Sequence, residues 1–280
     1  MRRTWGQPSD PVAVVLPGAG STADFVTRAF GPPLAGAGYA LVTEDPVAGS
    51  EVVARALAGL DEAVRRYRVR LAGGVSLGAH LAVRWAAASP AAAGLDGLLL
   101  ALPAWSGPPG AVAAACAVAA AEVEAYGVAG ALHRAGGTGT RWVLDELAAA
   151  WPRYGADLPV TLRAAAGSPG PTEAELARVG VPVGLAAFVD DPLHPLAVAE
   201  QWASAFRRAV LERLQLADPG PDRAVLGAAT LRALHRAAAA PAGKNRRSTA
   251  APRRAALPRD PAPAAPTLSR PATRPGGRRG

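Results

Sequence analysis

The chain has 280 residues, half of them hydrophobic and 5% aromatic, so it can bury a large core in one domain with an insertion or in two small domains. Its formal charge of +8 is concentrated in residues 241–280, which carry ten basic side chains and one acidic side chain. The 240 residues before this segment are therefore close to neutral, which excludes a basic nucleic-acid-binding face on the folded part.

Cysteine content and apolar runs restrict the class of protein further. Cys116 is the single cysteine, which excludes an internal disulfide and a cysteine-rich metal site. No apolar segment of the signal-peptide type follows Arg2 and Arg3. The longest apolar run, residues 111–121, is too short to cross a bilayer. We therefore expect a soluble, cytoplasmic protein with no membrane partner.

Strand-like and helix-like segments alternate through the first hundred residues. The β-branched run at 11–16 is typical of a strand that is buried on both faces of a parallel sheet. Ser50 is placed to cap the N-terminus of a helix that reaches Tyr67. The predicted elements of this part are strand 11–16, helix 23–37, strand 39–42, helix 50–67, a strand from 69, a helix ending near 89, and strand 95–102.

The alternation stops near residue 103 and returns at residue 181. The segments between them are helical, at 111–135, 141–151 and 172–179, so we predict a helical insertion over about 110–180 that serves as a lid. Afterwards come strand 181–189, helix 196–208, strand 210–216 and helix 223–238. Regular alternation predicts an α/β fold, a mostly parallel sheet with helices on both faces.

The last forty residues differ in composition from everything before them. Residues 241–280 contain eight prolines among Ala, Arg, Ser, Thr and Gly, and such a segment buries too little apolar surface to fold. The expected organisation is a single domain at 1–240 and a disordered, basic, Pro/Ala/Arg-rich tail at 241–280. We interpret the tail as a solvated appendage, with contact to nucleic acid or anionic lipid as the alternative.

A G-x-S-x-G sequence at Gly74–Gly78 stands between a predicted strand and a predicted helix. A nucleophilic serine on such a sharp turn needs small residues two positions before and two after it, because the backbone approaches too closely for a Cβ. The N–H of Leu77 then faces any oxyanion formed at Ser76. The alternative is a glycine-rich turn whose serine only caps the following helix.

The first glycine turn, at 17–23, has two interpretations. Its G-x-G-x-x-A pattern, with Asp45 at the end of the next strand, fits a dinucleotide-binding turn and a nicotinamide-dependent oxidoreductase that uses Gly18, Gly20 and Asp45. It also fits an oxyanion loop whose N–H near Ala19 faces the serine turn. Pro17 and the serine turn two strands later favour the oxyanion loop.

A candidate acid follows the strand predicted at 181–189. Asp191, beside Asp190, stands where a carboxylate can orient an imidazole and stabilise its protonated form. The alternative is that one of the two aspartates caps the helix that starts near Leu196.

The chain has four candidate bases, because it contains four histidines. His194 shares a turn with Asp191 and is our predicted base. His133, in the helical insertion, is the alternative. We interpret His80 as a packing residue of the helix after the serine turn, and His235 as an exposed residue of the last helix.

Three segments together resemble the α/β-hydrolase superfamily, and in particular small bacterial serine esterases and lipases. They are LPGAGS at 16–21, GGVSLGAH at 73–80 and FVDDPLHP at 188–195. The resemblance covers roughly residues 11–237 and implies an eight-stranded, mostly parallel sheet that lacks its first strands here, with a lid after the sixth strand. It also implies Ser76 as nucleophile, Leu77 and Ala19 as oxyanion donors, and Asp191 as the acid.

The sequence departs from the family's pattern at one place that matters. The family's histidine follows the last strand, and residues 217–222 contain none. Either His194 or His133 supplies the base, or the protein binds its ligand without turnover. We predict a serine hydrolase of small carboxylic esters or thioesters with Ser76, Asp191 and His194, without cofactor or metal. Its apolar acyl pocket would come from the insertion, with Trp142 and Trp151.

Overall fold

The computed structural model of the chain describes residues 2–6, 10–136 and 140–240. The chain divides into residues 1–245 and residues 246–280, and every described residue lies in the first part. The tail expected at 241–280 lies outside the described residues.

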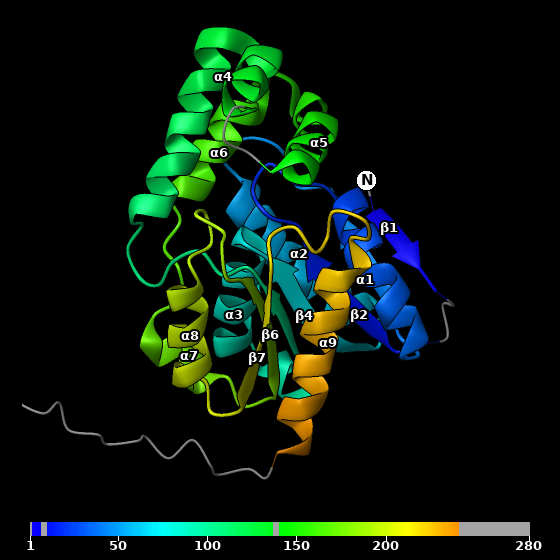
Figure 1. Cartoon of the computed structure of the whole chain (residues 1–280). Helices are drawn as coiled ribbons and strands as arrows, with labels where there is room; N and C mark the ends of the chain where they lie inside the picture. The colour runs from blue at the N-terminus through cyan, green and yellow to red at the C-terminus, as the bar shows by residue number, and fades with distance from the viewer. Residues whose placement is uncertain (1, 7–9, 137–139, 241–280) are drawn as a thin grey trace, which may run out of the picture. The chain divides into compact units, whose positions relative to one another are not determined.

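A seven-stranded sheet is the centre of the described part of the chain (Figure 1). Its spatial order is β1-β3-β2-β4-β5-β6-β7, and every neighbouring pair is parallel except β1 and β3. The strands are β1 (Arg2–Trp5), β2 (Val12–Leu16), β3 (Ala40–Glu44), β4 (Val69–Val75), β5 (Gly97–Ala101), β6 (Val183–Phe188) and β7 (Ala209–Leu214). The predicted mostly parallel α/β fold is confirmed. The resemblance implies an eight-stranded sheet without its first strands, and the described residues form seven strands, one more than the six predicted from the sequence.

The edge strand β1 is absent from the sequence predictions. Its Arg-Arg-Thr-Trp sequence has no apolar run, because an edge strand pairs on one side only and tolerates charged residues there. Its register places Trp5 opposite Leu41 of β3. The six strands that were predicted are the parallel ones, whose apolar runs reflect burial on both faces.

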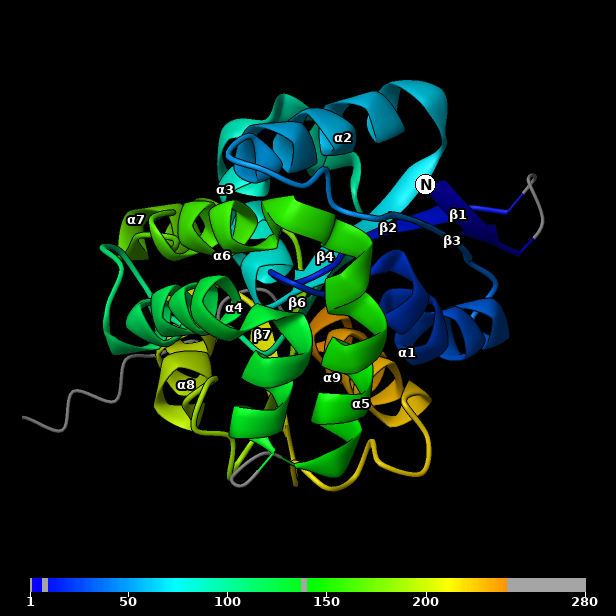
Figure 2. The ribbon, with the colours of Figure 1, turned by 90° about the horizontal axis from the view of Figure 1, so that it is seen from above.

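Helices cover both faces of the sheet (Figure 2). One face carries α1 (Ala23–Gly36) and α9 (Ala224–Ala239). The other carries α2 (Val52–Arg66), α3 (Leu77–Ala88), α7 (Glu173–Arg178) and α8 (Leu196–Ala205), and a 3₁₀ turn, η1 (Pro90–Gly94), precedes β5. The strand side chains alternate between the two apolar layers: Leu98 and Leu100 face α3, whereas Leu99 faces α9, and all three are fully buried.

The predicted cap of α2 is wrong. The helix begins at Val52 with Glu51 as its N-cap residue, and no side chain caps it. A turn comes first, in which the Val52 N–H donates to the Gly49 carbonyl oxygen, so Ser50 lies before the first helical turn.

The predicted helical insertion lies over the carboxyl ends of the strands (Figures 1 and 2). It consists of α4 (Ala111–Ala135), α5 (Arg141–Ala150), the 3₁₀ segment η2 (Trp151–Asp157) and α6 (Leu158–Ala166), and it leads into α7. Its own small core includes Ala19 from the loop after β2, and its Ala165 packs on Leu77 at the start of α3. The insertion therefore packs directly on the first glycine turn, at 17–23, and on the helix start that follows the serine turn.

Helix α4 is long and apolar enough, by length and composition alone, to cross a membrane, with a mean hydropathy of 1.5. Gly127 breaks it, however, with φ 68° and ψ 172°. The Arg134 guanidinium lies 4.6 Å from the centre of the Tyr126 ring and pairs with Glu122, so the chain folds back after the break. Each straight arm is shorter than the roughly 20 residues that a membrane-spanning helix needs.

Candidate active site

Ser76 stands on a strained turn between β4 and α3. Its φ of 53° and ψ of −116° are unusual for a residue with a side chain. A Cβ on Gly74 would overlap the backbone of Gly78, and a Cβ on Gly78 would overlap the carbonyl oxygen of Leu16. The glycines two before and two after the serine are therefore required by close backbone approach, as the spacing predicts.

Three side chains form a continuous hydrogen-bonded row at this turn. The Ser76 Oγ is 3.0 Å from His194 Nε2, and His194 Nδ1 is 2.7 Å from Asp191 Oδ2. Ser76 occupies the N-cap position of α3, but its side chain makes no capping hydrogen bond, so the alternative of a capping serine is wrong. The Asp191 side chain is 8% exposed and that of His194 is 19% exposed, so the row is partly open to solvent at the imidazole.

The partners of the His194 ring determine which nitrogen carries its proton. A carboxylate only accepts hydrogen bonds, so we place the proton on Nδ1, where it is donated to Asp191. The Nε2 atom is then free to accept the hydroxyl proton of Ser76. This tautomer is the one that a general base needs.

Asp191 is held in its charged form by the turn that contains it. Burial opposes the charge, but the hydrogen bond and charge of His194, together with backbone N–H groups of Leu193 and His194, lower the pKa of Asp191 below its ordinary value. Asp190 instead accepts the N–H of Leu216 at 2.7 Å. Neither aspartate caps α8, whose N-cap residue is Pro195, so that alternative is wrong.

The sheet brings the two turns together, because β4, β5 and β6 are neighbours. The Ser76 N–H donates to the carbonyl oxygen of Ala101 at the end of β5, and the Leu102 N–H donates to that of Ala186 in β6. The three strand ends are thereby tied to one another, and the turn after β6 reaches across β5 to Ser76.

The two expected oxyanion donors lie at the serine turn. Leu77 is the first residue of α3, so its N–H has no acceptor within the helix, and the described hydrogen bonds give neither Leu77 nor Ala19 a backbone acceptor. Gly18 lies against the turn, since a Cβ there would be 3.3 Å from the Ser76 Cβ. The loop that contains Ala19 therefore borders the serine, and the N-terminus of α3 adds a partial positive charge.

The insertion covers the same loop. The Tyr154 hydroxyl donates to the Ser21 carbonyl oxygen at 2.5 Å, and Trp151 Nε1 would be 2.9 Å from a Cβ on Gly20. Asp45, the expected ribose ligand of the dinucleotide hypothesis, accepts the Ala23 N–H through one oxygen and pairs with Arg153 through the other. The glycine turn is thus covered by the insertion, and both oxygens of the Asp45 carboxylate are already bonded to protein groups, so neither is available for a dinucleotide.

The other histidines do not join the row. His133 and His235 are exposed, on α4 and α9, and no described hydrogen bond connects either ring to Ser76. His80 is fully buried one turn after Ser76, where its Nε2 accepts backbone N–H groups. Among the described histidines, His194 alone is hydrogen-bonded to the serine.

The loop after β7, where the family's histidine is expected, fastens the insertion. The Trp142 indole N–H donates to the Leu216 carbonyl oxygen at 2.6 Å, and Glu146 accepts from both Arg28 and Arg223 at 2.8 Å. Burial opposes the charge of Glu146, but these arginines lower its pKa below the ordinary value.

Trp142 also has a different place from the one predicted. Its ring stacks on Phe25 and meets the Phe188 ring edge-on, in the core between the sheet, α1 and α9. The prediction of a pocket wall is therefore wrong for this residue, because its apolar face is already buried against the sheet. It attaches the insertion instead.

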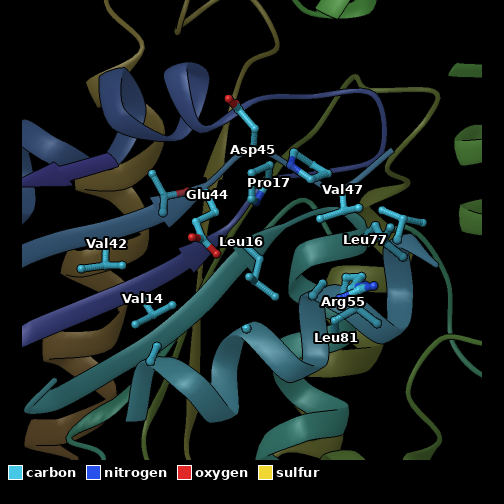
Figure 3. A pocket seen from close by; sticks show the side chains of 17 residues that line it. Val14, Leu16, Pro17, Val42, Glu44, Asp45, Val47, Arg55, Leu77 and Leu81 are labelled. Carbon is cyan, nitrogen blue, oxygen red and sulfur yellow. The ribbon is translucent and has the colours of Figure 1, made fainter. Parts of the chain in front are cut away.

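A cavity of about 70 Å³ lies between α2 and the loop that follows β2 (Figure 3). Leu16, Leu77 and Leu81 point into it, and the Glu44 carboxylate lies at its edge. Gly18 also lines it, whereas Ser76 and His194 do not. The cavity is therefore lined by one expected oxyanion donor, Leu77, and by the residue before the other, Gly18, and it does not contain the hydrogen-bonded row.

No protein-family model matches the chain, and no curated protein matches it in sequence. Solved structures do match. A non-heme bromoperoxidase, BpoC, of Mycobacterium tuberculosis is 16% identical, with a TM-score of 0.60 over 85% of this chain and 96% of that one. A hydrolase of Pseudomonas aeruginosa is 21% identical, with a TM-score of 0.62 over 81% of this chain and 91% of that one.

A third match comes from work on carboxylesterases of the thaumarchaeon Nitrososphaera gargenis, with 11% identity and a TM-score of 0.62 over 77% of this chain and 85% of that one. At these identities the likeness concerns the fold. The chain has the α/β-hydrolase fold, as the resemblance in its sequence implies.

Proposed function

We propose that the protein is a serine hydrolase that cleaves small carboxylic esters or thioesters through an acyl-enzyme on Ser76. The observation that carries the proposal is the row Ser76–His194–Asp191, with 3.0 Å between Oγ and Nε2 and 2.7 Å between Nδ1 and the carboxylate. A serine hydroxyl is a poor nucleophile at neutral pH unless an adjacent base takes its proton, and His194 lies within reach to do so.

The first half of the reaction forms the acyl-enzyme. As Oγ attacks the carbonyl carbon of the substrate, His194 Nε2 takes the hydroxyl proton, and the carbonyl electrons move onto oxygen. The N–H groups of Leu77 and Ala19 hold the resulting oxyanion. The charge of Asp191 stabilises the imidazolium. When the carbonyl re-forms, the bond to the alcohol or thiol breaks and His194 returns the proton to the leaving group.

The second half releases the acid. His194 takes a proton from a water molecule, whose oxygen attacks the acyl carbon, and the same N–H groups hold the second oxyanion. Collapse breaks the bond to Oγ, which regains its proton from His194. The side-chain exposure of 19% at His194 leaves the imidazole accessible to water for this step. The sum is one ester and one water consumed, and one acid and one alcohol or thiol formed.

The structural neighbours agree with this chemistry. They include a protein described as an acetylester hydrolase, one from a study of carboxylesterases, and a thioesterase domain of a biosynthetic pathway, all of them at or below 18% identity. The fold, however, supports many chemistries, so the proposal rests on the row of side chains.

A fluorophosphonate probe tests the proposal, because it reacts with a serine that a base activates. We expect the wild type to be labelled and Ser76→Ala to remain unlabelled. Ser89→Ala, at the other end of α3, is the matched control and should label as the wild type does. Hydrolysis of p-nitrophenyl esters of increasing acyl length, and of a matching thioester, then gives the substrate class. Equal labelling of wild type and Ser76→Ala would refute the assignment.

A binding protein without turnover is the alternative that the missing histidine at 217–222 motivated. The hydrogen bond between His194 and Ser76 supports turnover, and the labelling experiment distinguishes a hydrolase from a binding protein. Background labelling of the wild type, together with a ligand that raises its Tm, would favour the binding protein. Binding of NADH or NADPH at millimolar concentration would instead favour the oxidoreductase.

A further inference from the structure

His80 lies one helical turn after Ser76 on α3, and its side chain is fully buried. Its ring meets the Trp105 ring edge-on at a centroid distance of 4.5 Å and lies 5.3 Å from the Trp202 ring. This burial agrees with the interpretation of His80 as a packing residue. The ring also makes hydrogen bonds that the sequence does not predict, and these suggest a second role.

The Nε2 atom of His80 accepts two backbone N–H groups, that of Ala104 at 3.1 Å and that of Trp105 at 3.5 Å. Since a backbone N–H only donates, Nε2 has to be unprotonated, and the ring is neutral with its proton on Nδ1. Burial, followed by the charges of His194 and Arg84, lowers the pKa of His80 to about 3. The ring therefore remains an acceptor in neutral and mildly acidic solution.

The segment that His80 holds follows a strained residue. Among the described residues, Leu102 and Ser76 are the two non-glycine residues with positive φ, at 55° and 53°. Such a conformation is strained and persists only where its surroundings enforce it. A hydrogen bond to Ala186 holds Leu102 from the β6 side, and His80 holds Ala104 and Trp105 directly after it.

The same segment also contacts the helix that follows His194. Trp202 of α8 donates its indole N–H to the Ser106 Oγ at 2.9 Å, and its ring packs on His80. α8 begins at Leu196, two residues after His194. Residues 102–106 therefore connect the helix that starts next to Ser76 with the helix that starts next to His194.

We propose that His80 is a positioning residue which, through its two hydrogen bonds at Nε2, fixes residues 102–106 and thereby sets the distance between Ser76 and His194. The proposal rests on the proposed function and gives His80 no contact with substrate. The proton transfer needs the two reacting atoms within about 2.6–3.2 Å, and a misplacement of about 1 Å costs on the order of a hundredfold in rate.

Two substitutions separate the hydrogen bonds from the packing. In His80→Gln the side-chain amide oxygen can take the place of Nε2, whereas in His80→Asn the shorter amide cannot reach the two N–H groups. His235→Gln, at an exposed histidine of α9, is the control for a change of residue type. The measurement is the second-order rate of fluorophosphonate labelling at Ser76, well below the Tm of each variant.

We expect His80→Gln and His235→Gln to label within about threefold of the wild type, and His80→Asn to label at least about tenfold more slowly while folded. Wild-type labelling of folded His80→Asn would overturn the proposal, because His80 would then be a packing residue only. Equal slowing in His80→Gln and His80→Asn would overturn it as well, because the ring and not its acceptor would matter.

A second measurement does not depend on hydrolysis. Imidazole ¹⁵N spectra report the hydrogen bonds of His194, and amide exchange reports the protection of the Ala104 and Trp105 N–H groups. Both should match the wild type in His80→Gln and change in His80→Asn. If the wild type is not labelled at all, the proposed function fails, and these spectra still decide the role of His80. Should His80→Asn not fold, unprotected Ala104 and Trp105 amides in the wild type would overturn the proposal.

Discussion

Acidification is expected to destabilise the protein through His80. In the folded state the buried ring has a pKa of about 3, whereas an unfolded histidine titrates near 6.5. Below pH 6.5 the unfolded chain binds a proton that the folded chain does not, so the free energy of unfolding falls as the pH drops toward 3. Over the whole range this amounts to about 5 kcal/mol, and between pH 7.5 and 4.5 linkage gives about 3 kcal/mol.

Urea unfolding followed by tryptophan fluorescence at pH 7.5 and 4.5 measures this loss. The wild type should lose about 3 kcal/mol more than His80→Gln, which has no titrating ring at this position. His235→Gln, a substitution at an exposed histidine of α9, is the control for the change of residue type and should lose as much as the wild type. Asp191 and Glu146, whose folded pKa values are lowered, lose their stabilisation at still lower pH and are common to all three proteins.

The refuting result is a wild type and a His80→Gln variant that lose the same free energy between the two pH values. In that case the folded protein would accommodate a charged His80. The two hydrogen bonds at Nε2 would then not be fixed, because a protonated nitrogen cannot accept the N–H groups of Ala104 and Trp105.

Other substitutions probe the row, the serine turn and the attachment of the insertion. His194→Ala should lower kcat for an ester at least about a hundredfold with an unchanged circular dichroism spectrum, and full activity in this variant would exclude it as the base. Gly78→Ala should cost at least about 2 kcal/mol of unfolding free energy, read as a fall in Tm, because its Cβ would overlap the Leu16 carbonyl; a wild-type Tm contradicts this. Glu146→Gln should lower the free energy of unfolding by only about 1–2 kcal/mol, because one of the two arginines that pair with Glu146 is nearly half exposed to solvent. The variant should also be cleaved faster by protease within α5, and an unchanged cleavage rate would argue against an ionic attachment of the insertion.

Sequence patterns predict the elements of this fold that are buried. The runs at 11–16 and 95–102 are almost entirely apolar, because helices cover both faces of these parallel strands. A continuous apolar run can be recognised in the sequence. The edge strand β1 lacks this signal. η2 and α6 are also missed, because Pro152 and Pro159 interrupt the segment, although each proline stands at the start of a helical turn where its missing N–H costs nothing.

The candidate site depends on a different kind of information. The glycine spacing around Ser76 and the position of Asp191 at a strand end are local features, and the sequence expresses both. Which histidine approaches the serine depends on the strand order β4-β5-β6, which no local pattern contains. The hydrogen bonds of His80 cannot be predicted from the sequence for a related reason. Their donors are backbone N–H groups 24 and 25 residues away, and because every residue but proline has such a group, no residue type marks them.

The attachment of the insertion to the loop after β7 has a consequence for how this fold can change. If the acid and the base both come from the turn after β6, then the proposed row needs no side chain from the described residues 195–240, and β7 and α9 act as scaffold. The loop at 215–222 then does not need to carry a catalytic histidine, and its Leu216 carbonyl oxygen accepts the indole N–H of Trp142 from the insertion. Substitutions in this loop would then change how firmly the insertion is attached to the sheet without changing the hydrogen-bonded row of Ser76, His194 and Asp191.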